Sequence, residues 1–256
     1  MNTAFLDVQD LQMRFQGITA LDSVSFTLER GRITSLIGPN GAGKTTLFNC
    51  VTGMYRPSGG KVRLDGEDIT AMAAHRIARH GVARTFQNLA LFGGLTVRDN
   101  LIAGAYLQGS SGLLQGAFLS PAARREQRAA EQAADEVLAF LGMEDTAGVL
   151  PSELSYGRQK QVEFARALMQ KARLVLLDEP MAGMSQPEKA AMTALIHRVR
   201  DQYGITFLVV EHDIPVIMDI SDKIVVLDFG RKIADGVPQD VQNNPAVIAA
   251  YLGSEH

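Results

Sequence analysis

The sequence predicts an α/β protein with a parallel-sheet core, an N-terminal antiparallel β part and a helical insertion. In the first third, short runs alternate apolar and polar residues, as half-buried strands do. Residues from about 96 to 142 are rich in Ala, Glu and Arg, with apolar residues three to four apart, which is typical of helices. After residue 157, strand-like and helix-like segments alternate, which indicates a parallel sheet.

In the first third, FLDVQDLQMRF and LDSVSFTLERG are predicted strands, and ITSLIG at 33–38 is a buried strand that ends in glycine. GKTTLFNCVTG then predicts a helix closed by Gly53, and KVRLDGEDI a further strand and turn. Beyond residue 157 the alternating segments are LVLLDE, QPEKAAMTALIHRVRDQYG, TFLVVEH, IPVIMDIS, KIVVLDFG and RKIADG.

The insertion contains two predicted helices, TVRDNLIAGAYL and SPAARREQRAAEQAADEVLAFLG. They are separated by the Gly- and Ser-rich segment GSSGLLQGAFLS, for which we expect a mobile loop. The predicted organisation is a core formed by residues 1–90 and 156–256 and a helical subdomain at 91–155.

Composition excludes several classes of protein. The 256 residues are 46% hydrophobic and 21% charged, which is ordinary for a globular protein. The net charge of −3 gives no basic footprint for nucleic acid. Cys50 is the single cysteine, so no intrachain disulfide is possible and a reducing compartment is expected. The N-terminus lacks the pattern of a secretory signal, and no apolar run reaches the roughly 20 residues of a membrane span.

The segment GPNGAGKT at 38–45 matches the phosphate-loop pattern G-x-x-x-x-G-K-[ST] at every fixed position. Glycines let the backbone turn its N–H groups toward phosphate oxygens, and the following helix N-terminus adds partial positive charge. Lys44 supplies a charge for the β- and γ-phosphates, and Thr45 a hydroxyl for Mg²⁺. The alternative is a glycine-rich turn with a solvated lysine. The ATP-binding residues expected here are Gly38, Pro39, Asn40, Gly41, Ala42, Gly43, Lys44, Thr45 and Thr46. This motif predicts that the α/β core is a P-loop NTPase.

LVLLDEP at 174–180 is an apolar strand that ends in two acids. Because successive strand residues point to opposite faces, Asp178 and Glu179 are expected to have different roles. Asp178 is the predicted metal-side residue, and Glu179 the general base or water-positioning group. Taken alone, an Asp-Glu pair at a strand end is usually a solvated turn. The phosphate loop favours the catalytic interpretation.

His212 ends the apolar strand TFLVVEH, at the sheet edge where ligands bind in α/β proteins. A histidine there can bind a γ-phosphate and hold the base and water, so His212 is the second predicted catalytic residue. The other histidines, at positions 75, 80, 197 and 256, lie in helical or tail contexts and are expected to be solvated.

The order GPNGAGKT, RTFQ, LSYGRQ, LVLLDEP and VVEHD resembles the ATPase subunit of an ABC transporter over most of the chain. The resemblance implies that Gln87 contacts Mg²⁺ and water, so the implied metal set is Thr45, Gln87 and Asp178. It also implies that Phe15 stacks on adenine, the alternative being a core strand residue. The signature residues, which act in trans, are Ser155, Tyr156, Gly157 and Arg158. The resemblance implies that Ser155 and Gly157 bind the γ-phosphate of ATP held by the opposite subunit of a head-to-tail dimer.

The segment after Gln87, the signature LSYGRQ and the tail GVPQDVQNNPAVIAAYLG together resemble the ATPases of branched-chain amino acid importers. Relatives of that subfamily serve urea, amides and aromatic acids. The implied partners are a second ATPase subunit (paralogue or self), two transmembrane permease subunits and, indirectly, a periplasmic binding protein. The implied cofactors are ATP and Mg²⁺, and the implied location is the cytoplasmic face of the inner membrane, as a peripheral subunit.

Two departures from the family pattern concern the dimer. The signature usually reads LSGGQ, whereas Tyr156 and Arg158 stand here in place of Gly and Gln. After LDEP, Met184 and Ser185 stand where the family commonly has Leu followed by Asp or Asn. The side chain of Tyr156 must therefore point away from the nucleotide or narrow the nucleotide cleft. We expect the helix that follows the signature to begin around Gln159.

The segment LALFGGLTV at 89–97 is the candidate site for the permease's coupling helix, because apolar residues directly follow Gln87. The alternative is that Leu91 and Phe92 belong to the core. ATPases of DNA repair need longer helical arms than this insertion provides, and translation-associated ATPases carry two cassettes. A regulator that binds ATP without turnover is disfavoured by the intact Glu179 and His212.

Overall fold

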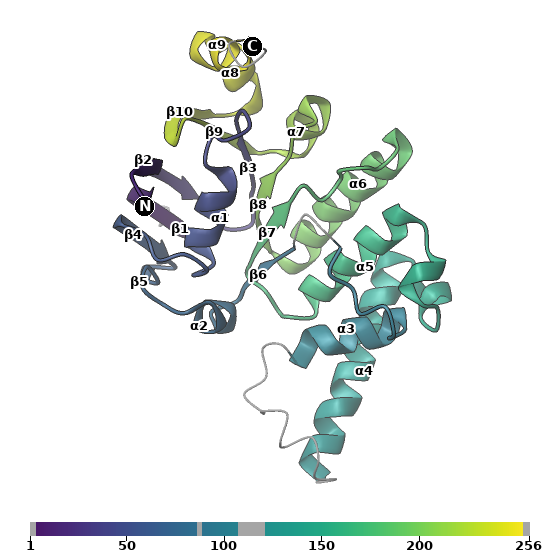
Figure 1. Ribbon diagram of the computed structural model, residues 1–256. Helices are drawn as coiled ribbons and strands as arrows, with labels where there is room; N and C mark the ends of the chain where they lie inside the picture. The colour runs from purple at the N-terminus through teal and green to yellow at the C-terminus, as the bar shows by residue number, and fades with distance from the viewer. Residues whose placement is uncertain (1–3, 86–88, 107–120, 253–256) are drawn as a thin grey trace.

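Two sheets and the helices around them make up the chain (Figure 1). The computed structural model describes residues 4–85, 89–106 and 121–252. Within them the larger sheet has the strand order β10-β9-β3-β8-β7-β6, and the N-terminal sheet has the order β2-β1-β4-β5. In the larger sheet β3, β6, β7, β8 and β9 are parallel, and β10 is antiparallel to β9. The N-terminal sheet is antiparallel throughout. The predicted α/β class, with parallel core and antiparallel N-terminal part, is therefore confirmed.

The strands of the N-terminal sheet are β1 (Leu6–Phe15), β2 (Ile18–Leu28), β4 (Gly59–Leu64) and β5 (Glu67–Asp68). The strands of the larger sheet are β3 (Ile33–Ile37), β6 (Val82–Arg84), β7 (Leu174–Asp178), β8 (Thr206–Val210), β9 (Lys223–Asp228) and β10 (Arg231–Gly236). The first helices along the chain are α1 (Lys44–Val51), α2 (Ala74–Arg79), α3 (Val97–Tyr106), α4 (Pro121–Leu141) and α5 (Tyr156–Leu168). They are followed by α6 (Gln186–Tyr203), α7 (Ile214–Ile220), α8 (Pro238–Gln242) and α9 (Pro245–Leu252). Short 3₁₀ turns lie at Glu144–Thr146 and Pro151–Glu153.

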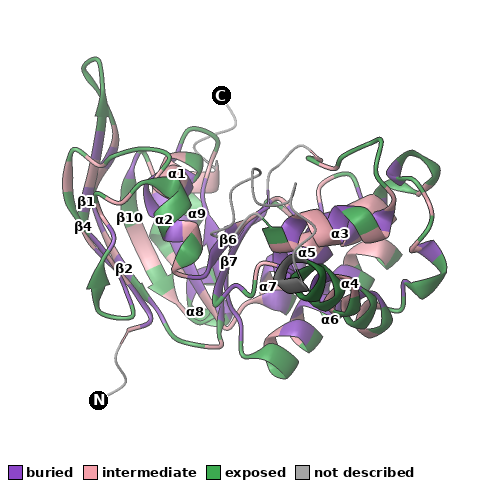
Figure 2. Cartoon of the chain, turned by 90° about the horizontal axis from the view of Figure 1, so that it is seen from below, coloured by how far each residue is buried: buried purple, intermediate pink, exposed green. Residues whose placement is uncertain are grey.

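The parallel sheet is covered on both faces, so its strands are continuous apolar runs. Leu176 of β7 and Leu208 of β8 face α1 and the N-terminal sheet. Their chain neighbours Leu177 and Val209 face α5, α6 and α7 on the other side. In Figure 2 the buried residues are concentrated along the strands between these layers. Helix α1, which follows the phosphate loop, thus lies on one face of the sheet and α5 on the other.

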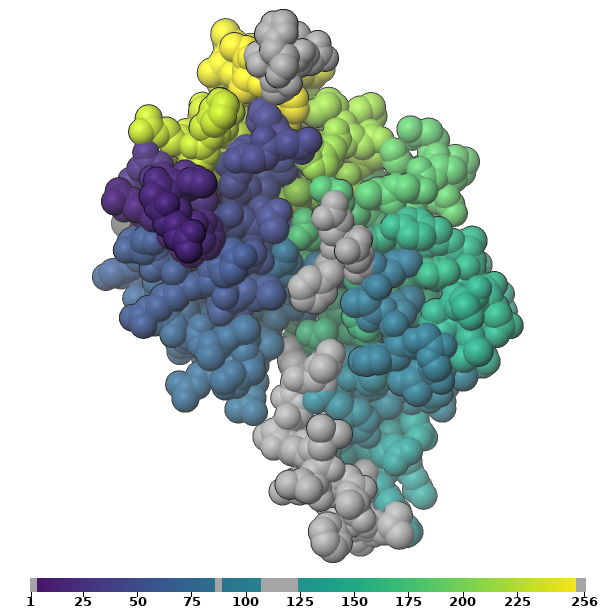
Figure 3. All heavy atoms as spheres, in the orientation of Figure 1, coloured from purple at the N-terminus to yellow at the C-terminus, as the bar shows by residue number. Residues whose placement is uncertain are grey.

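Helices α3 and α4 form the helical part of the chain and share an apolar core with α5. On the face seen in Figure 3, the N-terminal third of the chain, in purple and blue, lies beside this helical part, in teal. Val162 of α5 packs in the helical core, whereas Phe164 packs under the sheet. The division into residues 1–90 with 156–256 and residues 91–155 stays a prediction, and α5 is the element in contact with both sides.

Helix α5 begins at Tyr156, three residues before the expected start. The reason is that Ser155 caps the helix: its hydroxyl accepts a hydrogen bond from the Arg158 N–H at 3.4 Å. IPVIMDIS forms helix α7, and the tail forms α8 and α9. The segment GSSGLLQGAFLS lies outside the described residues. None of the described helices combines the length and apolarity needed to cross a membrane.

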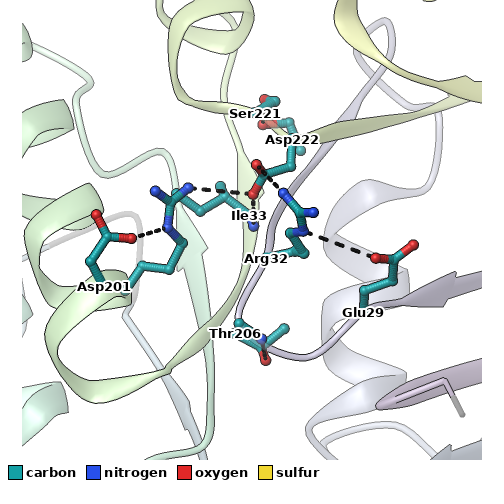
Figure 4. A network of polar contacts seen from close by, with 10 residues as sticks. Glu29, Arg32, Ile33, Asp201, Thr206, Ser221 and Asp222 are labelled. Atoms are coloured by element: carbon teal, nitrogen blue, oxygen red, sulfur yellow. Dashed lines mark hydrogen bonds and ion pairs between the residues drawn. The ribbon is translucent and has the colours of Figure 1, made fainter. Parts of the chain in front are cut away.

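The amino ends of the parallel strands are joined by a polar network around Asp222 (Figure 4). One carboxylate oxygen of Asp222 accepts from Arg32 at 3.1 Å, and the other from the Ile33 N–H at 2.8 Å. Arg200 of α6 also reaches this second oxygen, at 3.5 Å. Thr206 accepts the Gly31 N–H at 2.9 Å. These contacts fix the start of β3 to the neighbouring elements, at the end of the sheet away from the phosphate loop.

Candidate nucleotide site

The phosphate loop connects β3 to α1 at the carboxyl end of the central strand, where α/β proteins bind ligands. Gly38 has φ 149°, and a Cβ there would lie 2.0 Å from the carbonyl oxygen of Leu227. Gly43 has φ 101°, and its Cβ would lie 2.7 Å from the carbonyl oxygen of Ala20. No other residue type fits these two positions, so the surrounding strands impose the loop conformation.

Lys44 is the central cation of the loop. Its Nζ donates to the carbonyl oxygens of Gly38 at 2.6 Å and Pro39 at 2.9 Å. Burial lowers the pKa of Lys44, and the charges of Glu179 and Asp178 act in the opposite direction. Of the remaining loop residues, Asn40, Gly41 and Thr45 are exposed, Thr46 is half-buried and Ala42 is buried.

Asp178 ends β7 with only 6% of its surface exposed. Its Oδ2 lies 2.7 Å from Nη2 of Arg84, at the end of the neighbouring strand β6. Arg84 also donates to Oδ1 of Asn49 in α1 at 2.6 Å. Asp178, the predicted metal-side carboxylate, is thus tied to the phosphate-loop helix through the buried side chain of Arg84.

Glu179 and His212 are in direct contact, with Oε1 and Nε2 2.9 Å apart. Glu179 lies beyond the end of β7 and has a positive φ of 49°. Glu179 is therefore not a strand residue, so the expected strand alternation ends at Asp178. The two acids have different partners, Arg84 for Asp178 and His212 for Glu179. Backbone conformations with positive φ are costly for a side-chain-bearing residue and are typical of functional sites.

The hard oxygen donors Thr45 and Asp178 suit a magnesium ion. The described residues hold no group of three or more His, Cys, Asp or Glu side chains able to bind a metal. This donor set fits Mg²⁺, which takes one or two protein ligands and completes its shell with waters and phosphate oxygens. Gln87, the third predicted ligand, lies outside the described residues.

Phe15 ends β1 and is 38% exposed, so it is not a core residue. Its ring packs edge-to-face against Tyr55, with centroids 5.3 Å apart. An exposed aromatic face at this edge is available for a flat ligand.

The signature residues lie at the start of α5, across the sheet from α1. A Cβ on Gly157 would lie 2.4 Å from Oε1 of Glu188. Glu188 accepts from the N–H and hydroxyl of Ser185 at 2.9 and 2.7 Å. Ser185 is therefore the N-cap of α6, with Glu188 at the third helical position. The Tyr156 side chain lies against Gly183, whose added Cβ would be 3.2 Å from the ring, and is 44% exposed.

Three residues of this region did not emerge as site residues from the sequence. Arg84 and Glu211 are charged residues next to apolar strands, which is a weak signal in the sequence. The recognised motifs point instead to the nearby residues Gln87 and His212. Tyr251 of α9 hydrogen-bonds with the backbone of Gly38, and burial raises its pKa. No sequence signal links the C-terminal helix to the phosphate loop, because their contact depends on the tertiary fold.

The chain belongs to the ABC transporter family, as the family model described as ABC transporter matches residues 21–182. It is an ATP-binding ATPase subunit of that class. A second model, described as branched-chain amino acid ATP-binding cassette transporter, matches residues 231–256. The chain is 44% identical to the high-affinity branched-chain amino acid transport ATP-binding protein BraF of Pseudomonas aeruginosa, over 99% of each chain. It is 41% identical to the corresponding LivG protein of Escherichia coli K12, again over 99% of each.

Solved structures agree with this assignment. A nucleotide-free ATP-binding cassette of an ABC transporter is 30% identical, with a TM-score of 0.85 over 97% of this chain and 99% of the other. A cassette in its ADP conformation is 31% identical, with a TM-score of 0.86 over 98% and 99%. These likenesses confirm the predicted ABC ATPase fold and nucleotide binding.

Proposed function

We propose that the chain hydrolyses ATP at a head-to-tail dimer interface and energises a membrane permease that imports branched-chain amino acids. One observation carries the catalytic part: Glu179 contacts His212 at 2.9 Å, and both follow strands of the sheet whose central strand β3 leads into the phosphate loop. The cargo is supported by the match of residues 231–256 to the branched-chain family and by the named relatives. A sulfate/thiosulfate import ATP-binding protein of Chromobacterium violaceum is 34% identical over 97% of this chain and 63% of its own length, so the fold alone does not define cargo.

In this proposal the loop 38–46 holds the ATP phosphates through its backbone N–H groups and Lys44, and Phe15 stacks on the base. Thr45, Asp178 and Gln87 hold Mg²⁺, which neutralises phosphate charge when bound. Glu179 orients the attacking water and accepts its proton. His212 keeps Glu179 in place through their 2.9 Å contact and donates toward the γ-phosphate.

The signature acts in trans. Helix α5 lies on the sheet face away from α1, so Ser155 and Gly157 of one subunit serve the loop of another. The side chain of Glu188 lies directly against Gly157, and the ring of Tyr156 lies against Gly183. The partners are a second ATPase subunit, two permease subunits and, indirectly, a periplasmic binding protein. The complex lies at the cytoplasmic face of the inner membrane.

The permease is proposed to contact the segment 89–97. Leu91 packs into the helical core, whereas Phe92 is 48% exposed. Asn100, fully buried, holds this turn: it accepts the Phe92 N–H at 2.8 Å and donates to the carbonyls of Phe92, Leu95 and Thr96. A rigid turn that displays an aromatic side chain is suited to receive a partner helix.

Phe92→Ala should abolish transport in a reconstituted complex and leave the ATPase activity of the isolated subunit unchanged. Phe229→Ala is the matched control, because Phe229 is 87% exposed on the β9–β10 turn. Loss of both activities in the Phe92 variant would contradict the docking role.

Cargo is tested by purifying the chain from membranes with its permease and binding protein. The binding protein is then titrated with leucine, urea, a short amide and an aromatic acid. Leucine binding and leucine-stimulated ATPase activity are the expected result. Selective response to any of the others would replace the branched-chain assignment.

A further inference from the structure

Glu211 is a buried carboxylate between the end of β8 and His212. Only 4% of its surface is exposed, which is rare for an acid unless it has specific partners. Nothing in the proposed mechanism uses it. Glu211 directly precedes His212 in the chain and lies next to the loop that carries Glu179.

Each carboxylate oxygen of Glu211 accepts one backbone N–H. Oε1 accepts from Met181 at 2.8 Å, and Oε2 accepts from His212 at 3.1 Å. Burial raises the pKa of the Glu211 carboxyl, and these two N–H groups act in the opposite direction. A carboxylate is suited to this position, because it offers acceptors on both oxygens and its bonds to N–H groups are charge-assisted.

The contacts join the loops that follow β7 and β8. Glu179 donates its N–H to the Val210 carbonyl at 2.9 Å, so the two loops are linked on the strand side of Glu211 as well. Met181 is fully buried, and its sulfur lies 3.7 Å from the Thr193 hydroxyl of α6. Hydrogen bonds to buried groups therefore hold the backbone on both sides of the Glu179–His212 contact. The side chains themselves are partly exposed, His212 to 44% and Glu179 to 19%.

We propose that Glu211 is a positioning residue for catalysis: it bridges the two loops and keeps His212 on Glu179. This inference rests on the proposed ATPase mechanism. Without the bridge, the Glu179–Val210 bond on the strand side still links the two loops, but the backbone N–H groups of Met181 and His212 lose their shared acceptor. A displacement near 1 Å at reacting groups is enough to lower a rate by about a hundredfold.

The test compares Glu211→Gln with Thr206→Val. Glutamine keeps the shape of Glu211 but presents an NH₂ group to one of the two backbone N–H groups. Thr206 lies at the other end of the same strand, and it too accepts a backbone N–H from a buried position. We expect Glu211→Gln to lower kcat between about tenfold and a hundredfold, with the KM for ATP within about twofold of wild type. Thr206→Val should lower the unfolding midpoint and leave kcat unchanged.

A double-mutant cycle with His212→Ala separates positioning from general destabilisation. If Glu211 acts through His212, the Glu211→Gln/His212→Ala double variant turns over at the rate of His212→Ala alone. A full additional loss in the double variant would overturn the inference, as would an unchanged kcat in a folded Glu211→Gln. If His212→Ala itself retains wild-type turnover, the proposed mechanism fails instead, so the two failures are distinguishable.

Discussion

The two ends of the parallel sheet are built differently. At the amino end, both oxygens of Asp222 have partners, and the network joins β3 to α6. At the carboxyl end, Gly38 and Glu179 have positive φ, and the side chain of His212 is 44% exposed. A network of paired polar groups joins the elements at the amino end, whereas the carboxyl end also carries the phosphate loop, the left-handed turn at Glu179 and a partly exposed histidine. The comparison indicates that stability and chemistry are separable along the strands of this protein.

The largest effect is expected for Glu179→Gln, at the carboxyl end. The amide cannot accept a proton from water, so turnover should fall by roughly 10²–10⁴-fold. The variant should retain ATP and form a stable dimer, because binding groups are untouched. ATPase assays and gel filtration with ATP measure both effects. Unchanged turnover would refute the role of Glu179 as base.

Gly38→Ala tests whether the carboxyl end tolerates a side chain. The added Cβ would lie 2.0 Å from a backbone oxygen, so ATP affinity should fall more than about tenfold and unfolding should become easier by more than about 2 kcal/mol. Gly17→Ala is the control. Gly17 has φ 95° but no atom within 4 Å of an added Cβ, so only about 1 kcal/mol of strain is expected. If nucleotide titrations showed the same loss of ATP affinity for Gly38→Ala and Gly17→Ala, the clash of the added Cβ at Gly38 would not be the cause.

Asp222→Ala changes the amino end of the sheet. In contrast to Glu179→Gln, it should lower stability and leave turnover unchanged. It leaves the buried N–H of Ile33 without its acceptor, which should cost about 1–3 kcal/mol in urea unfolding. The kcat should stay at the wild-type value. Asp201→Ala is the control: Asp201 pairs with the same Arg200, but its side chain is 66% exposed, so a change within about 0.5 kcal/mol is expected. A fall in kcat for Asp222→Ala would show that the two ends are coupled.

Much of the candidate site could be predicted from local patterns. The phosphate loop carries its own signature, because the required backbone conformation restricts Gly38 and Gly43 to glycine. Asp178, Glu179 and His212 were recognised as polar residues that end apolar strands, and parallel strands bring such ends together. Their chemical roles remain proposals that the variants above address.

Contacts that join distant elements were not predictable from these patterns. The start of α5 is a different case: it is expected near Gln159, but Ser155 is a local N-cap signal that would have placed it at Tyr156. Strand alternation predicts that Asp178 and Glu179 point to opposite faces of the sheet. In the structure the strand ends at Asp178, and the chain makes a left-handed turn at Glu179. The approach of Glu188 of α6 to Gly157 of α5 also required the folded structure, because the two residues are far apart in the chain.

The sequence by itself determined the class of protein, the α/β core and the residues that make up the phosphate loop. These features depend on hydrophobic period and on local backbone requirements, which neighbouring residues define. The tertiary structure alone decided that Arg84 binds Asp178 and that Glu211 bridges the loops beside His212. Such buried charges need partners far away in the chain, and only packing of the strands side by side brings those partners within hydrogen-bond distance.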